Sequence, residues 1–308
     1  MSIKNYNDYS TYIRNLFGER VQKISLNVGY SCPNRDGTKG IGGCTYCNIS
    51  SIKPAYAKAT KTISKQLEEG ISFFTKKYKS QNYIAYFQSY TNTYNDKSTL
   101  IKAYEEALSF PGIIGLVIAT RPDCIDQEVV AILKEFSKSK YVSVELGIES
   151  TNEQTLKKIN RCHTFRDTIN AIELLTSAEI KTGGHLILGF PWETKEDVLL
   201  HAQNISVLPI NYLKLHHLQI LKFTQMAKDY IANEKDFHFL KVNQYLDLII
   251  EFLMHLNPKI VIQRFISESP SHLLIAPQWN GIKNFEFAQK VDTIMKERGV
   301  LQGTNYKK

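Results

Sequence analysis

The sequence predicts an α/β protein built as a partial (β/α)6, TIM-like barrel with a C-terminal cap segment. Short runs rich in β-branched and aromatic residues alternate with longer amphipathic stretches, which is the pattern of βα units around a parallel sheet. The alternation repeats six times without a break in composition. Periodicity alone does not separate a barrel from a doubly wound sheet, but the most unusual residues follow the ends of the predicted strands, where a barrel carries its chemistry.

The predicted strands are residues 23–30, 83–90, 113–120, 141–149, 181–190 and 212–221. The predicted helices between them are residues 63–78, 100–108, 127–136, 165–178 and 196–208. Asp126, Thr164 and Thr194 stand just before three of these helices, as N-cap residues do. Beyond residue 221 the pattern changes to a helix over 243–256 and an extended run over 259–265. We therefore expect a barrel over residues 1–222 and a cap over 223–308.

Composition indicates a globular protein and excludes the disordered and fibrous classes. The chain has 308 residues, of which 43% are hydrophobic and 22% are charged, enough for one large domain or two modest ones. Its longest apolar run, residues 113–119, is far shorter than the roughly 20 residues of a membrane span. The N-terminal residues contain no apolar segment typical of a secretory signal. We expect a cytoplasmic protein with no membrane partner.

Three of the five cysteines lie in one loop after the first predicted strand. Cys32, Cys44 and Cys47 share a segment with four glycines and a proline, so the backbone is free to fold back and bring three thiols together. A structural zinc site normally has four protein ligands, and this loop offers one C-x-x-C pair, a third cysteine and no histidine. A disulfide conflicts with the expected compartment and leaves one thiol over. These observations favour a four-iron cluster held by three thiolates, with one iron open to a small molecule.

The cysteine loop also carries a family resemblance. The stretch CPNRDGTKGIGGCTYCN, residues 32–48, resembles the radical S-adenosylmethionine (SAM) superfamily, whose first loop ends in Cys-x-aromatic-Cys. Eleven residues separate Cys32 from Cys44, as in the elongator-like branch and its small single-domain members of the YhcC/YtqA type. Residues 119–123 (ATRPD), 145–150 (ELGIES), 160–164 (NRCHT) and 185–191 (HLILGFP) are similar to further motifs of that branch, with Cys162 in place of a glycine.

The resemblance implies a radical SAM enzyme with a [4Fe-4S] cluster on Cys32, Cys44 and Cys47. A one-electron donor such as flavodoxin or ferredoxin would reduce the cluster, and cleavage of SAM would give a 5′-deoxyadenosyl radical that abstracts a substrate hydrogen. The implied SAM contacts are Tyr46 to the adenine, Thr91 to the amino group, Glu149 to the ribose, Arg161 to the carboxylate, and His185. The sequence departs from the family at residues 88–91 (QSYT), where relatives have a Gly-Gly motif, and at His185, where they have Asp.

Three other residues at the expected mouth of the barrel have open roles. Cys124 follows the third strand and either contacts substrate or is a buried inert thiol, which we favour. In the sixth strand, period-two alternation puts Lys214 and His216 on one face and His217 on the other. If that face lines the barrel, Lys214 and His216 are candidates to bind an anionic substrate.

The substrate class is suggested by charge and by the resemblance together. The formal net charge is +8, and basic residues cluster at Lys53, Lys58, Lys61 and Lys65, at Lys76, Lys77 and Lys79, and at Lys157, Lys158 and Arg161, with Tyr56 and Tyr78 interleaved. Such clusters suit RNA contacts but also occur on ordinary solvated surfaces.

Elongator-like relatives act on the wobble uridine of tRNA, so the resemblance implies a tRNA substrate. The chain ends soon after the barrel, so we expect no acetyltransferase domain and instead remodelling of an existing C5 side chain, for example carboxymethylaminomethyl to aminomethyl uridine. The alternatives are the same radical chemistry on a small metabolite or protein side chain, and a zinc-stabilised RNA-binding protein without catalysis.

Overall fold

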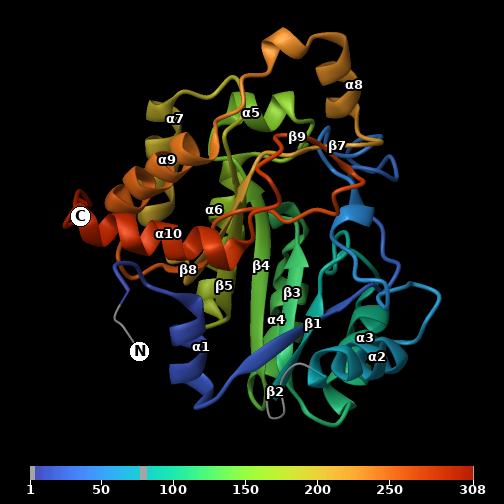
Figure 1. Ribbon diagram of the computed structural model, residues 1–308. Helices are drawn as coiled ribbons and strands as arrows, with labels where there is room; N and C mark the ends of the chain where they lie inside the picture. The colour runs from blue at the N-terminus through green and yellow to red at the C-terminus, as the bar shows by residue number, and fades with distance from the viewer. Residues whose placement is uncertain (1–3, 77–81, 308) are drawn as a thin grey trace.

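A computed structural model describes residues 4–76 and 82–307 and confirms the partial barrel. Seven parallel strands form one curled sheet in the order β1-β2-β3-β4-β5-β6-β8 (Figure 1). The strands are β1 (Val21–Leu26), β2 (Asn82–Phe87), β3 (Ile113–Thr120), β4 (Tyr141–Glu149), β5 (Lys181–Leu188), β6 (Tyr212–His217) and β8 (Val261–Arg264). A small antiparallel pair, β7 (Ile220–Leu221) and β9 (Leu274–Ala276), lies beyond the carboxyl ends of the large sheet.

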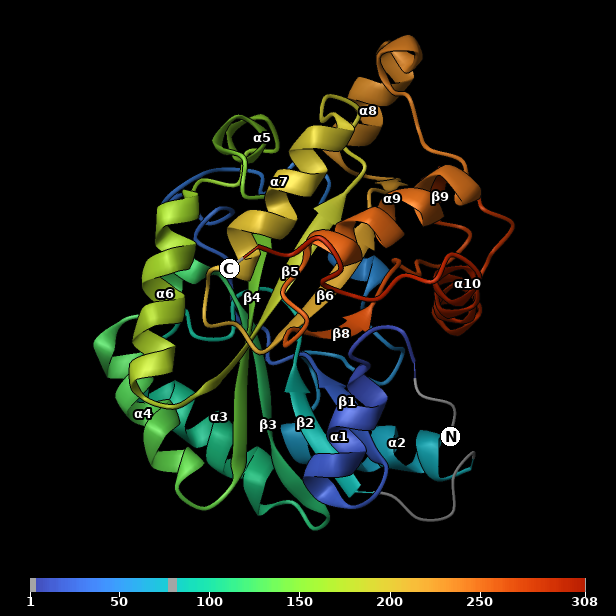
Figure 2. The same cartoon turned by 90° about the vertical axis from the view of Figure 1, so that its left-hand side faces the viewer.

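Helices follow the strands and cover the outer face of the sheet, as Figure 2 shows for α3, α4 and α6. Their bounds are α1 (Tyr9–Phe17), α2 (Ile63–Thr75), α3 (Lys97–Ser109), α4 (Gln127–Ser137), α5 (Glu153–Lys158), α6 (Phe165–Ser177), α7 (Lys195–Ser206), α8 (Gln225–Ala232), α9 (Val242–His255) and α10 (Asn284–Glu297). The predicted N-caps are confirmed: Asp126 accepts from Val129 N, and Thr164 and Thr194 each form a capping box.

Several boundaries differ from the predicted ones for identifiable reasons. The first strand ends at Leu26 because the backbone of Asn27 bonds to the buried side chain of Gln66 and not to a neighbouring strand. The Gln66 side chain accepts from Asn27 N–H at 2.9 Å and donates to the Asn27 carbonyl at 3.0 Å. The sixth predicted strand is divided, since residues 220–221 leave the large sheet to pair with β9. The helix predicted over 63–78 ends at Thr75, and its last two predicted positions lie outside the described residues.

The extended run predicted in the cap is a seventh barrel strand. β8 pairs in parallel with β6, and the N-terminal segment also reaches this edge, where Ile262 N donates to Asn7 O at 2.7 Å. Helix α1 contacts both β1 and β8, the two edges of the open sheet. The C-terminal segment therefore contributes a strand to the barrel, which the predicted boundary at residue 222 had excluded.

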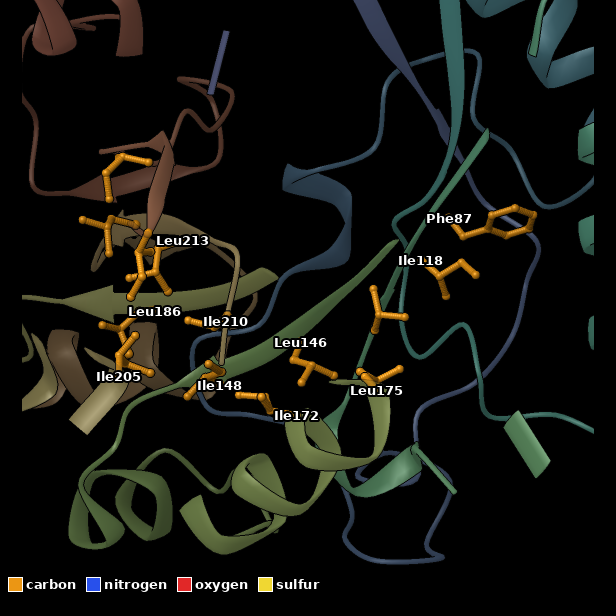
Figure 3. Close-up of a cluster of buried hydrophobic side chains, with 14 of the residues drawn as sticks. Phe87, Ile118, Leu146, Ile148, Ile172, Leu175, Leu186, Ile205, Ile210 and Leu213 are labelled. Atoms are coloured by element: carbon orange, nitrogen blue, oxygen red, sulfur yellow. The ribbon is translucent and has the colours of Figure 1, made fainter. Parts of the chain in front are cut away.

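Alternation along the strands separates an apolar outer layer from an interior that is apolar around Val117 and Ala119 and polar elsewhere. Outward residues such as Ile118, Leu146, Leu186 and Leu213 pack against the helices and are fully buried (Figure 3). The intervening positions face the inside of the barrel and carry polar side chains in the central strands: Tyr86, Glu145, His185, Lys214 and His216. Since a barrel of this type is normally filled by branched apolar residues, the polar interior marks the functional side of the sheet.

Candidate active site

One cavity of about 250 Å³ opens at the carboxyl ends of the strands and contains all eight residues predicted to hold the cluster or to contact SAM. The residues that line it include Cys32, Cys44, Cys47, Tyr46, Thr91, Glu149, Arg161 and His185, together with Lys214 and His216. They come from the loop after β1, from the ends of β2, β4, β5 and β6, and from the segment after α5. The arrangement matches the position expected for chemistry in a β/α barrel.

The cysteine loop folds back on itself through its own backbone. Cys47 N donates to Cys44 O at 3.0 Å, and Gly43 N donates to Asn34 O at 2.8 Å. Gly43 has a φ of +85°, a conformation that side chains rarely adopt, so glycine is needed at this turn. Thr45 ties the loop to the rest of the cavity wall, since its N–H donates to Ile159 O and its carbonyl accepts from Met226 N. All five cysteines are free thiols.

Nitrogen donors surround the sulfur of Cys44. Arg161 Nη1 lies 3.5 Å and Asn34 Nδ2 lies 3.6 Å from Cys44 Sγ, so both side chains can donate to a thiolate there. Burial, followed by the nearby Cys44 and Cys32, raises the pKa of Cys47 to about 11. A buried thiol of this kind is deprotonated when a metal binds it, and donors to sulfur are one way in which proteins stabilise sulfur-ligated clusters.

The donor set fits an iron–sulfur cluster held by three thiolates with nitrogen donors behind them. Cys32, Cys44 and Cys47 line the same cavity and would hold the cluster, which would leave one iron without a protein ligand. No three His, Cys, Asp or Glu side chains of residues 4–76 and 82–307 form a group that could hold a single metal ion.

Arg161 is held in place by three contacts on the cavity wall. Its Nη2 donates to Gly147 O at 2.6 Å, its Nε donates to His163 Nε2 at 2.9 Å, and its guanidinium lies 3.9 Å from Glu149 Oε1. Gly147 leaves the space that this pair occupies, because a Cβ there would lie 2.6 Å from Glu149 Oε1 and 2.7 Å from Arg161 Nη2. Glu149 has a φ of +68° at a bulge in β4, a strained conformation of the kind found at ligand sites.

Two buried polar atoms of the cavity wall have no hydrogen-bond partner among the described residues. They are Thr91 Oγ1 and Arg121 Nη1. Because buried polar groups are normally paired, these atoms are suited to contact a bound ligand. Thr91, Glu149 and Arg161 thus fit a small polar molecule beside the thiols, as the amino, hydroxyl and carboxylate groups of SAM require.

A buried carboxylate in the barrel interior was not singled out from the sequence. Glu145 Oε1 accepts from Lys23 Nζ at 2.5 Å, and its Oε2 accepts from Tyr86 OH at 2.7 Å and lies 2.8 Å from His185 Nε2. The Lys214 ammonium is 3.6 Å away. Although burial disfavours the charge, Lys23 and Lys214 hold the pKa of Glu145 well below its usual range. A charged residue at an inward position of a buried strand is the signal that could have identified it.

The structure also shows where the other residues noted in the sequence lie, namely Lys214, His216, Cys124 and Cys162. Lys214 and His216 share a face, as alternation predicted, and that face lines the cavity. His217, which we expected on the opposite face, also lines the cavity and stacks on Trp279 with ring centroids 4.0 Å apart. Burial raises the pKa of Cys124 to about 12, as expected of an inert thiol. Cys162 is exposed and has a φ of +56°, which explains why glycine suits this position.

The basic clusters are only partly available to a partner. Lys61 pairs with Glu69 at 2.5 Å and Lys65 with Glu68 at 2.9 Å. Tyr56 packs against the hydrophobic core, so it does not offer a free ring for base stacking. Arg161 is buried in the cavity wall, while Lys77, Tyr78 and Lys79 lie outside the described residues. Within the described ranges, no helix is both long and apolar enough to cross a bilayer.

Comparisons with known proteins match most of the chain to two family models. The family described as "Radical SAM superfamily" matches residues 26–205, and "Radical_SAM C-terminal domain" matches residues 210–297. The chain is 32% identical over 300 residues to the uncharacterized protein YtqA of Bacillus subtilis (strain 168), covering 97% of this chain and 92% of that one. It is 33% identical over 264 residues to protein YhcC of Escherichia coli (strain K12), covering 85% and 84% of the two chains.

More distant matches include solved structures. The archaeal Methanocaldococcus infernus Elp3 with an N-terminal deletion has a TM-score of 0.67 at 16% identity, covering 91% of this chain and 63% of that one, which shows a shared fold. A protein named tRNA uridine(34) acetyltransferase, from Methanocaldococcus infernus (strain DSM 11812 / JCM 15783 / ME), is 25% identical over 193 residues, 61% of this chain and 34% of that protein.

Proposed function

This chain belongs to the radical SAM superfamily and is a radical SAM enzyme, and we propose that it remodels the C5 side chain of a tRNA wobble uridine. Enzymes of this family use a [4Fe-4S] cluster and SAM and need an electron donor. The two groups together supply a 5′-deoxyadenosyl radical that abstracts a hydrogen atom from the substrate. The protein's part is to bind and orient the reactants and to exclude water.

In this proposal Cys32, Cys44 and Cys47 hold the cluster, and a reduced flavodoxin or ferredoxin provides the electron. The observation that carries it is that the three thiols line a single cavity, with an arginine donor on Cys44. Loss of Cys44 or Cys47 should therefore remove iron and acid-labile sulfide from the purified chain.

SAM binds beside the thiols, with Tyr46, Thr91, Glu149, Arg161 and His185 as its proposed contacts. Support comes from the unpartnered hydroxyl of Thr91 and from the space that Gly147 leaves for Arg161 and Glu149. His185 already uses Nε2 in its contact with Glu145, so Nδ1 is the ring nitrogen left for a ligand.

A tRNA substrate is supported by the net charge of +8 and by the relative named tRNA uridine(34) acetyltransferase. Conversion of carboxymethylaminomethyl to aminomethyl uridine is the reaction that we propose as an example. The test is mass spectrometry of bulk tRNA nucleosides from cells with and without the gene, with rescue by wild type, Cys44→Ala or Cys47→Ala.

Accumulation of one wobble-uridine derivative that only the wild type clears would support the proposal and identify the substrate. Identical nucleoside profiles would refute it. In that case the same radical chemistry acts on a small metabolite or a protein side chain, and 5′-deoxyadenosine formation would not respond to RNA.

A further inference from the structure

A bulge in the sheet brings two cations side by side in the floor of the cavity. β6 and β8 pair Leu213 with Ile262 and then Lys214 with Arg264, so one residue of β8 is skipped. Lys214 and Arg264 both line the cavity. Like charges at directly paired positions of neighbouring strands destabilise a sheet, and bulges of this kind often aim a side chain into a site.

Acidic neighbours neutralise this pair only in part. Glu145 has one charge and is already engaged by Lys23, and the Lys214 ammonium is 3.6 Å from it. Burial lowers the pKa of Lys214 to about 8, and the positive charges of Lys23 and Arg264 act in the same direction. The floor of the cavity therefore has more positive than negative charge.

Arg264 lacks a close acceptor. Its contact within the described ranges is an ion pair with Glu268 at 3.8 Å, and no described residue accepts a hydrogen bond from its guanidinium. Glu268 is shared, because it accepts from Asn284 N at 2.8 Å and lies 3.9 Å from Lys283. A guanidinium has five N–H donors in a planar fork that fits a carboxylate, so this one is available to an incoming anion.

We propose that Arg264 and Lys214 form an anion subsite that binds a carboxylate on the group that the enzyme acts on, with His216 beside it. His216 lines the same wall, and its Nδ1 lies 3.1 Å from Ser267 Oγ. The ligand group must be terminal, because the Lys214 side chain is only 10% exposed and a backbone phosphate carries a nucleoside on either side. This inference rests on the proposed tRNA function and adds to it the residues that would distinguish a carboxylate-bearing side chain from a neutral or cationic one.

The test measures binding rather than turnover. Fluorescent anticodon stem-loop RNAs carrying 5-carboxymethylaminomethyl, 5-aminomethyl or unmodified uridine at the wobble position are titrated with the cluster-loaded full chain, with SAM and without reductant. Wild type is expected to bind the carboxylate RNA about 10- to 100-fold more tightly than the aminomethyl RNA, because only the carboxylate RNA forms a hydrogen bond between charged groups at this subsite. Arg264→Gln should remove that preference, and Arg264→Lys should retain part of it.

Lys283→Gln is the matched control. Like Arg264→Gln, this substitution removes one positive charge that lies near Glu268, but Lys283 does not line the cavity. It should keep the preference for the carboxylate RNA. Circular dichroism of each variant reports whether the chain is still folded, and its affinity for SAM is measured in parallel.

Three results would overturn the subsite. If Arg264→Gln keeps the preference, the guanidinium is irrelevant to it. If it weakens binding of all three RNAs equally, a phosphate binds there, and if it weakens binding of SAM itself, the methionine carboxylate binds there. If wild type binds none of the RNAs, the proposed tRNA function fails, and the free nucleosides 5-carboxymethylaminomethyluridine and 5-aminomethyluridine then decide the subsite by the same comparison in calorimetry.

Discussion

Replacing Glu145 by Gln is expected to destabilise the fold while leaving its shape intact. The substitution preserves the volume of a side chain that is fully buried. It removes the negative charge that lies 2.5 Å from Lys23 Nζ and 3.6 Å from Lys214 Nζ, and it changes the acceptor for Tyr86 and His185. Two ammonium groups then face each other in the barrel interior without a counter-charge.

Breaking a buried ion pair by removing one partner costs about 3–5 kcal/mol. That is a large part of a total free energy of unfolding that is typically about 5–15 kcal/mol. The pKa of Lys214 determines how this loss in the free energy of unfolding changes with pH. In the wild type at pH 6, Lys214 is protonated and is stabilised by the charge of Glu145, whereas at pH 9, above its pKa of about 8, it is largely neutral and gains less from that charge. The loss should therefore be smaller at pH 9 than at pH 6.

The assay is urea unfolding followed by circular dichroism at both pH values, with wild type and Glu145→Gln compared at equal ionic strength. Glu135→Gln is the control, because Glu135 pairs with Lys138 on the surface, where both side chains are more than half exposed. It should change the free energy of unfolding by less than about 0.5 kcal/mol. A loss under about 1 kcal/mol for Glu145→Gln at pH 6, or an equal loss at both pH values, would refute the argument.

Four further predictions concern single positions. Gly147→Ala places a Cβ 2.7 Å from Arg161 Nη2, so SAM affinity in equilibrium dialysis should fall about tenfold with little change in Tm. Gly184→Ala, whose Cβ meets packed isoleucine methyl groups at 2.6 and 2.9 Å, should instead cost about 1–3 kcal/mol of stability and spare SAM binding. Binding of the carboxylate RNA should weaken as pH rises through about 8, because Lys214 loses its proton, and Lys214→Arg should abolish this dependence; a pH-independent wild type would contradict it. The charged and titratable groups that face this ammonium are Glu145, Lys23, Tyr86, His185, His216 and Arg264. Cys162→Gly should raise stability by about 1 kcal/mol through relief of a positive φ and leave the iron content unchanged, which thermal unfolding and iron analysis would check.

The sequence by itself determined the features that depend on local pattern. Alternating apolar runs predicted the order of strands and helices, and side-chain chemistry predicted caps such as Thr164 and Thr194. The three cysteines and the motifs at the strand ends predicted one shared cavity, because parallel strands bring their carboxyl ends to the same edge. Period-two alternation put Lys214 and His216 on one face of their strand, but only the structure shows that this face lines the cavity.

Only the tertiary structure decided which distant side chains meet. Gln263 donates to Glu145 across 118 residues of chain, and no local pattern contains that contact. The seventh strand, the bulge that sets Arg264 beside Lys214 and the burial of Tyr56 all depend on how the sheet closes and registers. Sequence periodicity specifies which face a residue takes, whereas barrel curvature and strand register specify its neighbours, and the charge balance of the cavity follows from those neighbours.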